Sequence, residues 1–271
     1  MAGAGRFVSM TGKARKFAGF AVAALIAVPV PAEAEADETS GRKVMIGVGI
    51  QAKPRYPGAD SSRIAFLPLV DVWRKGEPMT VESPDEAIGF ALVGKRSGRF
   101  AAGPAIGFAP TRAANDLPGL PKVGFGVEAG AFAEAWPLKP LRLRAELRQG
   151  IGAHKALTGD LAADLVWRRG YEGPMLTVGP RLRWGSGKYN RVYFGVGAPG
   201  IAALAPYEPG SGIYAVGAAA GLRLPLGRVF GLYGYAGYDR LTRRAANSPI
   251  VTAGSPDQLS GGVALTYRFG I

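Results

Sequence analysis

The clearest pattern in this chain is a strict alternation of apolar and small or polar residues between positions 261 and 271. The apolar positions include Val263, Leu265, Tyr267 and Phe269. A period of two residues is typical of a β-strand that has one apolar face and one polar face. An aromatic C-terminal strand is typical of outer-membrane barrels, where it pairs with the first strand and turns its apolar side to lipid. We therefore predict that these four residues form a barrel-closing strand.

The same alternation runs through the middle of the chain, where charged residues occupy one face of the predicted strands. In residues 141–148, leucine and alanine alternate with arginine and glutamate. A charge on a lipid-exposed face costs roughly 2–4 kcal/mol at the bilayer midplane, so these charges must face a lumen. Opposite charges enclosed there can form mutually satisfied pairs. The predicted lumen charges are Glu128, Arg142, Arg144, Glu146, Arg148, Asp164, Arg181 and Arg183.

A soluble β-sandwich with one solvated face is the alternative interpretation. Trp167, Trp184, Tyr267 and Phe269 end the apolar faces of their strands, where the aromatic girdles of membrane proteins lie. This placement favours an all-β fold, a single closed antiparallel transmembrane β-barrel.

Proline and glycine clusters divide the chain into about 12 strands, within a range of roughly 10 to 14. Short strands are expected at residues 79–82 and 87–93, and residues 191–196 could add another. If the N-terminus is periplasmic, the tight connections all fall on the periplasmic side, at residues 75–78, 95–98, 137–140, 169–172 and 225–227. The long connections then lie outside, at residues 53–62, 110–122, 185–211 and 241–258.

The N-terminus has the order of a secretory signal peptide. Basic residues precede an apolar run from Phe17 to Val30, and small residues follow it up to Ala36. The run is shorter than the roughly 20 residues of a membrane-spanning helix. We predict cleavage after Ala34 or Ala36, with residues 1–36 as the signal peptide and residues 37–271 as the barrel.

Composition restricts the chemistry. The 271 residues include 41 glycines and 10 tyrosines, no cysteine and one histidine, His154. A zinc site or a site with several histidines is therefore not expected. His154 lies in a turn and is predicted to be a rim residue in water. We predict no enzymatic activity, no catalytic or metal-binding residue and no cofactor. The net charge of +13 permits nucleic-acid binding in principle, but we place much of it inside the barrel.

Several short motifs, taken in order, resemble the MipA/OmpV family over nearly the whole mature chain. They are Tyr56-Pro57-Gly58, Tyr193-Phe194-Gly195-Val196, the Tyr214-containing stretch at 212–221, Ser248-Pro249-Ile250 and the closing stretch at 262–269. The resemblance implies a non-enzymatic outer-membrane barrel. The best-known member is a scaffold that joins a lytic murein transglycosylase to a bifunctional murein synthase, and other members are described as adhesins or immunogenic surface proteins.

The leading hypothesis is accordingly an outer-membrane scaffold of envelope or murein assembly, with a murein hydrolase and a murein synthase as partners. The alternatives are a small diffusion channel, with anion preference because arginines are in excess, or a surface adhesin. Membrane lipid is an expected partner, and so is lipopolysaccharide, whose phosphates basic residues in the long connections could bind. These residues are Arg55, Arg63, Arg112, Lys188, Arg191, Arg243 and Arg244.

Overall fold

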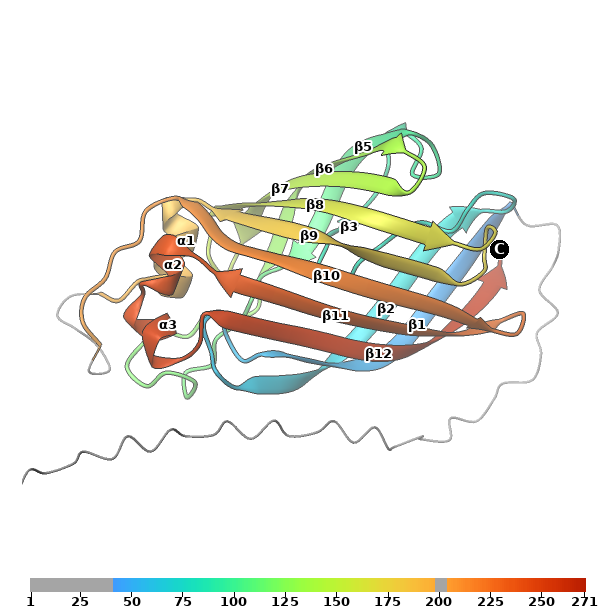
Figure 1. Ribbon diagram of the computed structural model, residues 1–271. Coiled ribbons are helices and arrows are strands. Elements are labelled where there is room, and N and C mark those ends of the chain that lie inside the picture. Colours follow the sequence, from blue (N-terminus) through green and yellow to red (C-terminus); the bar gives the residue numbers. More distant parts are fainter. Residues whose placement is uncertain (1–40, 198–203) are drawn as a thin grey trace, which may run out of the picture. The chain divides into compact units, whose positions relative to one another are not determined.

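The computed structural model describes residues 41–197 and 204–271. Their strands form one antiparallel sheet of twelve strands that curls round on itself (Figure 1). The strands are β1 (Arg42–Pro54), β2 (Ser62–Arg74), β3 (Ile88–Gly89), β4 (Val93–Gly94), β5 (Phe100–Phe108), β6 (Val127–Leu138), β7 (Leu141–Ile151), β8 (Leu157–Arg168), β9 (Met175–Gly185), β10 (Gly212–Leu226), β11 (Phe230–Leu241) and β12 (Asp257–Gly270). The predicted signal peptide lies outside the described residues.

Alternation in the sequence sets the two faces of the sheet, because successive side chains of a strand point to opposite sides. Along β7, buried and exposed residues alternate from Arg142 to Ile151. Leu143 and Leu147 lie on the outer face and are exposed, whereas Arg142 and Arg144 are buried on the inner face. The curled sheet is thus apolar outside and charged inside.

The first and last strands pair, as the terminal pattern predicts. β12 lies antiparallel to β1, with Leu265 opposite Val48 and Phe269 opposite Val44. On its other side β12 pairs with β11, so that its backbone is hydrogen-bonded along both edges.

The hydrogen-bonded order of strands runs from β2 through β1 and β12 back to β5 and β3, with β4 also paired to β5. Its ends, β2 and β3, are neighbours in the sequence. The predicted strand at residues 79–82 is wrong, because these residues have no strand structure. The predicted strand at residues 87–93 is reduced to the two-residue strands β3 and β4. Within the described ranges, no backbone pairing joins β2 to β3 or β5.

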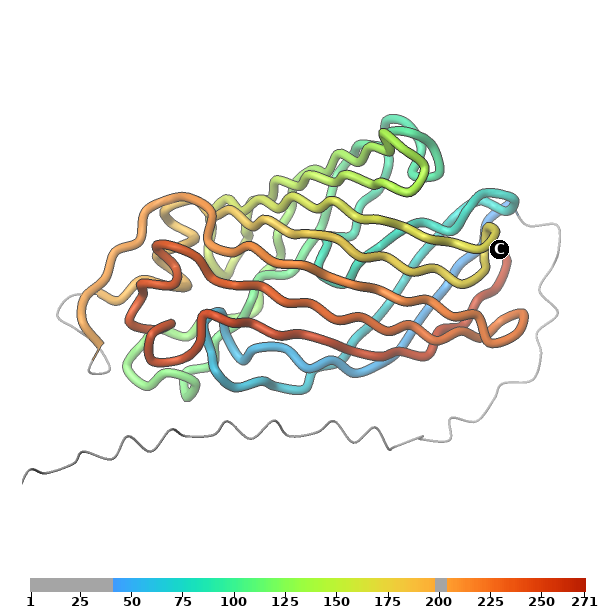
Figure 2. Tube along the Cα trace, viewed as in Figure 1, coloured from blue at the N-terminus to red at the C-terminus, as the bar shows by residue number. Residues whose placement is uncertain are grey.

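The long connections that follow β1, β5, β9 and β11 lie at one end of the sheet, together with the short connection of residues 152–156, and the other short connections lie at the opposite end (Figure 2). The long connections carry three helices, α1 (Gly187–Phe194), α2 (Arg243–Ala246) and α3 (Pro249–Ala253). Their apolar side chains pack with those of neighbouring connections around Tyr193, Phe194 and Ile250. We call this packed layer, formed by residues 55–61, 109–126, 186–197 and 242–256, the cap.

Helix α1 replaces the additional strand that could have formed at residues 191–196. The Ser186 side chain accepts a hydrogen bond from the backbone N–H of Tyr189 and so caps the N-terminus of the helix. Tyr189, Tyr193 and Phe194 are buried on one face of α1. Residues spaced four or five positions apart lie on one side of a helix. Burial of that side within the cap stabilises α1.

Candidate functional site

The interior of the curled sheet contains a dense network of ion pairs, with Arg142 at its centre. The Arg142 side chain is completely buried. Its guanidinium contacts Glu86 at 2.7 Å, Asp164 at 2.8 Å and Glu134 at 3.0 Å. These carboxylates come from the segment after β2, from β8 and from β6. Several carboxylates around one buried guanidinium offset the cost of removing these charges from water.

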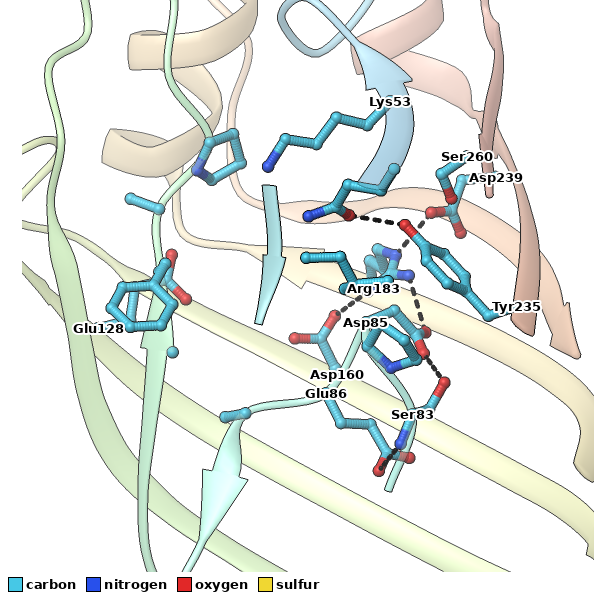
Figure 3. A pocket seen from close by; sticks show the side chains of 18 of the residues that line it. Lys53, Ser83, Asp85, Glu86, Glu128, Asp160, Arg183, Tyr235, Asp239 and Ser260 are labelled. Carbon is cyan, nitrogen blue, oxygen red and sulfur yellow. Dashed lines mark hydrogen bonds and ion pairs between the residues drawn. The ribbon is translucent and has the colours of Figure 1, made fainter. Parts of the chain in front are cut away.

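Strand β9 contributes two further arginines. Arg181 contacts Asp85 and Asp164, each at 2.7 Å. Arg183 contacts Asp85 at 3.1 Å and Asp160 at 3.2 Å, and Figure 3 shows its guanidinium between these two carboxylates. Asp85 therefore pairs with both arginines of β9, although it is almost a hundred residues away from them in the sequence.

Arg148 extends the network along β7. It contacts Glu128 at 2.9 Å and Asp160 at 2.6 Å, and it also pairs with Glu146. Arg144 contacts the same Glu146 at 2.6 Å. Ion pairs thus connect all of the predicted lumen charges: Glu128, Arg142, Arg144, Glu146, Arg148, Asp164, Arg181 and Arg183.

Residues 79–87, which we call the inner segment, lie against the inner face of the sheet. Met79 and Ala87 are buried, and Asp85 and Glu86 supply carboxylates to the arginines of β7 and β9. The backbone is bound as well: Arg144 donates to the carbonyl of Ala87 at 2.8 Å. The inner segment therefore fills part of the interior and neutralises charge there.

No local pattern predicts this placement. Glu86 is separated from Arg142 by 56 residues, and Asp85 from Arg183 by 98. The one available signal is the excess of inward arginines on β7 and β9, which requires carboxylates from elsewhere in the chain.

His154 is buried, so the prediction that it lies in water at the rim is wrong. It is 2% exposed and its Nε2 lies 2.9 Å from Glu128. Its Nδ1 accepts a hydrogen bond from the backbone N–H of Ala156 at 3.2 Å. Since Nδ1 is an acceptor, Nε2 carries the proton and donates to Glu128. Both ring nitrogens are engaged, and neither is available to activate a nucleophile.

Between the cap and the inner segment the interior encloses a cavity of about 500 Å³. Its polar lining includes Lys53, Glu128, Asp160, Arg183 and Tyr235 (Figure 3). Its apolar lining includes residues of β2, β3 and β5. The volume is within the usual range of small-molecule sites.

The cap covers this cavity with aromatic side chains. The rings of Tyr189 and Tyr214 stack at a centroid distance of 5.2 Å, and the Tyr193 hydroxyl donates to the carbonyl of Pro110 at 2.8 Å. Burial, with a smaller contribution from Tyr214, raises the pKa of the Tyr189 hydroxyl well above its ordinary value. Burial also raises the pKa of Tyr193, followed by the nearby Glu128 carboxylate.

Arg112 holds two parts of the cap together. Its guanidinium donates to the carbonyls of Pro121, Val192 and Tyr193 at 3.0–3.4 Å. The last two carbonyls belong to the C-terminal end of α1, where a cation also interacts favourably with the helix dipole. Burial lowers the pKa of Arg112. Arg112 is 4% exposed, so the expectation that it binds lipopolysaccharide phosphate is wrong.

The other predicted phosphate-binding cations differ in their surroundings. Arg55 pairs with Asp116 at 2.9 Å, and Arg191 approaches Glu208 at 3.6 Å. Lys188 and Arg243 are exposed on the cap. Arg63 donates to the Thr111 hydroxyl at 2.7 Å.

The outer face presents a continuous apolar surface over several strands. On β12, Leu265 is 46% exposed whereas its neighbour Thr266 is 5% exposed. The rings of Tyr267, Phe269 and Phe230 cluster near the short-connection end, with centroid distances of 5.4 and 5.9 Å. Exposed apolar residues also cover β1, β2, β7 and β8.

Within the described ranges, no three histidine, aspartate or glutamate residues form a metal-binding group. In the same part of the chain, no helix has the length and hydropathy to cross a bilayer.

The profile of one protein family, described as MltA-interacting protein MipA, matches residues 46–269. Among solved structures, the fold is similar to an outer membrane channel from Pseudomonas putida F1, with 10% sequence identity and a TM-score of 0.40. That similarity covers 89% of this chain and 100% of the channel. No curated protein sequence matches the chain.

Proposed function

The chain belongs to the MltA-interacting protein MipA family, and from this premise we propose that it is a non-enzymatic outer-membrane scaffold of murein assembly. In this proposal residues 1–36 direct export and are removed, and residues 37–271 form a transmembrane barrel. The partners would be a murein hydrolase and a murein synthase, consistent with the interaction named in the description of the family.

The apolar outer face supports the membrane location. A lipid-exposed position tolerates leucine, valine and aromatic residues but not charge, and Val263, Leu265 and Leu147 occupy such positions. In this proposal the barrel is closed between β2 and β5 by side chains and by the inner segment, because the backbone ladder does not continue there.

One observation carries the choice of a scaffold over an open pore: packed side chains bound the interior cavity toward both ends of the curled sheet. The arginines that a diffusion channel would present to anions already bind carboxylates, including those of Asp85 and Glu86 from the inner segment. The cap covers the other end of the interior with packed aromatic residues. Such a barrel offers partners its rims and outer surface.

The rim at the short connections is suited to an anionic partner surface. Exposed cations lie on four different connections or strand ends there: Arg74, Lys139, Arg169 and Arg228. In the described part of the chain, none of these four side chains lies within 4 Å of a carboxylate. Exposed charges of one sign steer a complementary partner and set the salt dependence of its association.

Affinity purification from solubilised outer membranes tests the proposal. The tagged protein is expected to recover a murein hydrolase and a murein synthase. A variant with Lys139→Ala, Arg169→Ala and Arg228→Ala is expected to lose most of this recovery, because the complementary charges are removed.

The matched control carries Lys188→Ala and Arg243→Ala on the cap and should recover the partners as the unmodified protein does. Recovery of no murein enzyme by the unmodified protein, in membranes where both enzymes are detected, would contradict the scaffold role.

A further inference from the structure

The gap in the backbone ladder between β2 and β5 lies beside the cavity. We call the facing edges of β2, β3 and β5 the seam. In the described residues, one side-chain hydrogen bond bridges the gap, from Arg63 at the start of β2 to Thr111 just after β5. Residues from both edges line the cavity, among them Leu69 and Val70 of β2 and Ile106 and Phe108 of β5.

Several of these lining residues also belong to the outer face. Val70 is 56% exposed and Phe108 is 61% exposed, although both border the cavity. An outward-pointing residue can border the cavity through its backbone, and here β2 and β5 are unpaired along the edges that face each other, so no backbone ladder separates the cavity from the outer surface. Side chains of the seam, many of them apolar, therefore separate the cavity from the surface that faces hydrocarbon in a membrane.

The routes along the axis of the curled sheet are obstructed in the described part of the chain. Tyr189, Tyr193 and Phe194 are buried in the cap above the cavity. Below it, Asp85 and Glu86 of the inner segment are held by arginines of β7 and β9. Access through the seam thus requires side chains to move but no backbone ladder to break.

The cavity also contains two cations that lack a carboxylate. Lys53 of β1 and Arg63 of β2 are direct cross-strand partners, and both line the cavity. No ion pair within 4 Å involves either of them among the described residues, and the buried Nε of Arg63 has no hydrogen-bond partner. Like charges directly opposite each other on paired strands repel. Figure 3 shows the Lys53 side chain reaching into the cavity.

We propose that the seam admits an anionic amphiphile with a single alkyl chain. Its carboxylate or phosphate head binds Lys53 and Arg63, and its chain lies along Leu69, Ile106 and Phe108. An oxyanion relieves the repulsion between the two cations and accepts charge-assisted hydrogen bonds, with arginine able to bind it bidentately. The apolar chain enters from hydrocarbon without crossing water.

Binding is tested on the full mature protein in lipid nanodiscs, with empty nanodiscs subtracted. The probes are radiolabelled dodecanoate, a lysophosphatidate of the same chain length, and dodecanol as the uncharged control. Tight binding of dodecanoate, of the lysophosphatidate or of both supports the site and identifies the head group. Dodecanol should bind at least about tenfold more weakly, because charge-assisted hydrogen bonds are lost. Equal binding of dodecanol and the anions would overturn the proposal.

The head-group site is tested by Lys53→Gln with Arg63→Gln, which should weaken binding of the anions by about 30-fold. Lys188→Gln with Arg243→Gln removes the same charge from the cap and should leave affinity unchanged. Folding of each variant is checked by its compact band on unheated gels. Unchanged affinity of the folded Lys53 and Arg63 variant would also overturn the proposal.

The route is tested on the unmodified protein with a dodecanoate that bears a diazirine at the far end of its chain. Photolabelling is expected within residues 66–70 or 105–108. Labelling spread over the outer faces of β7 to β10 would mean ordinary lipid contact, and labelling confined to α1 would mean entry through the cap. Either result contradicts entry of the alkyl chain through the seam. These readouts do not depend on murein partners, so the site and the scaffold role succeed or fail separately.

Discussion

A single arginine, Arg142, balances carboxylates from three parts of the chain. Replacing it by methionine leaves Glu86, Glu134 and Asp164 without their shared cation in a water-poor interior. Removal of one partner from a buried ion pair typically costs about 3–5 kcal/mol. We expect Arg142→Met to lower the free energy of unfolding by about this amount, measured by urea unfolding in lipid vesicles.

Arg228→Met is the matched control, because Arg228 is an exposed arginine on a short connection. Such surface substitutions usually change stability by less than about 0.5 kcal/mol. Equal stability losses in the two variants would mean that the interior network does not contribute as its geometry indicates.

Strand β12 shows how the two faces of one element differ. Leu265 lies on the outer face, whereas Ser260 lines the cavity. Leu265→Arg should cost roughly 2–4 kcal/mol in a membrane and should greatly reduce the yield of the compact, heat-modifiable band. Ser260→Arg should give a near-normal yield, since a cavity of about 500 Å³ can receive the side chain.

Ser260 is a better comparison than the adjacent Thr266, although both point inward. The Thr266 side chain lies close against Gly47 and Gly231 of the neighbouring strands, where a Cβ would be only 3.0 Å and 2.7 Å from it. A longer side chain at position 266 therefore has little room. Loss of Ser260→Arg together with normal yield of Leu265→Arg would reverse the assignment of the two faces.

Helix α1 makes the cap sensitive to alkali. The pKa of both Tyr189 and Tyr193 is raised above the ordinary value, so the folded cap holds these hydroxyls neutral. Their contribution to stability is therefore complete below about pH 10 and is lost as the pH rises above it. We expect loss of near-ultraviolet circular dichroism together with tyrosinate absorbance in an alkaline titration.

Tyr189→Phe removes one of these titrating groups and should shift the transition to higher pH. Its stability at neutral pH should change little, because the Tyr189 hydroxyl makes only a long contact of 3.4 Å to Tyr214. An unchanged alkaline midpoint would show that Tyr189 does not titrate with unfolding.

Elements differ in how far the sequence predicts them. β7 and β12 are predicted well because their alternation is local and uninterrupted. α1 is not, because Tyr193-Phe194-Gly195-Val196 also fits a strand, and the helix depends on the Ser186 cap and on burial among distant loops. The inner segment is missed for a related reason: Asp85 and Glu86 are placed by arginines far along the chain.

At the scale of the whole molecule, we expect the ion pairs of the inner segment to keep the interior closed to ions. The unmodified protein should therefore show little or no conductance in planar bilayers. Asp85→Asn with Glu86→Gln removes one of the carboxylates that each of Arg142, Arg181 and Arg183 contacts. We expect this variant to show channel openings with anion preference, measured from the reversal potential in a salt gradient.

Glu208→Gln is the control, because Glu208 pairs only with the exposed Arg191 among the described residues. It should remain as silent as the unmodified protein. Large steady conductance of the unmodified protein would instead support the diffusion channel, and cation preference of the double variant would contradict the role given to the arginines.

Because β1 pairs with β12, the first strand to be synthesised finds one of its two partners only when the last strand has been made. Read around the sheet from β3, the strands follow the chain to β12 and then continue with β1 and β2. The arrangement is a simple meander shifted cyclically by two strands. The hairpin of β1 and β2 is therefore made first but must wait for β12, whose partner residues, such as Lys43 and Gly270, are the most distant in sequence. Because such distant contacts form slowly, we expect the hairpin that borders the seam to be the last part of the sheet to be fixed in place.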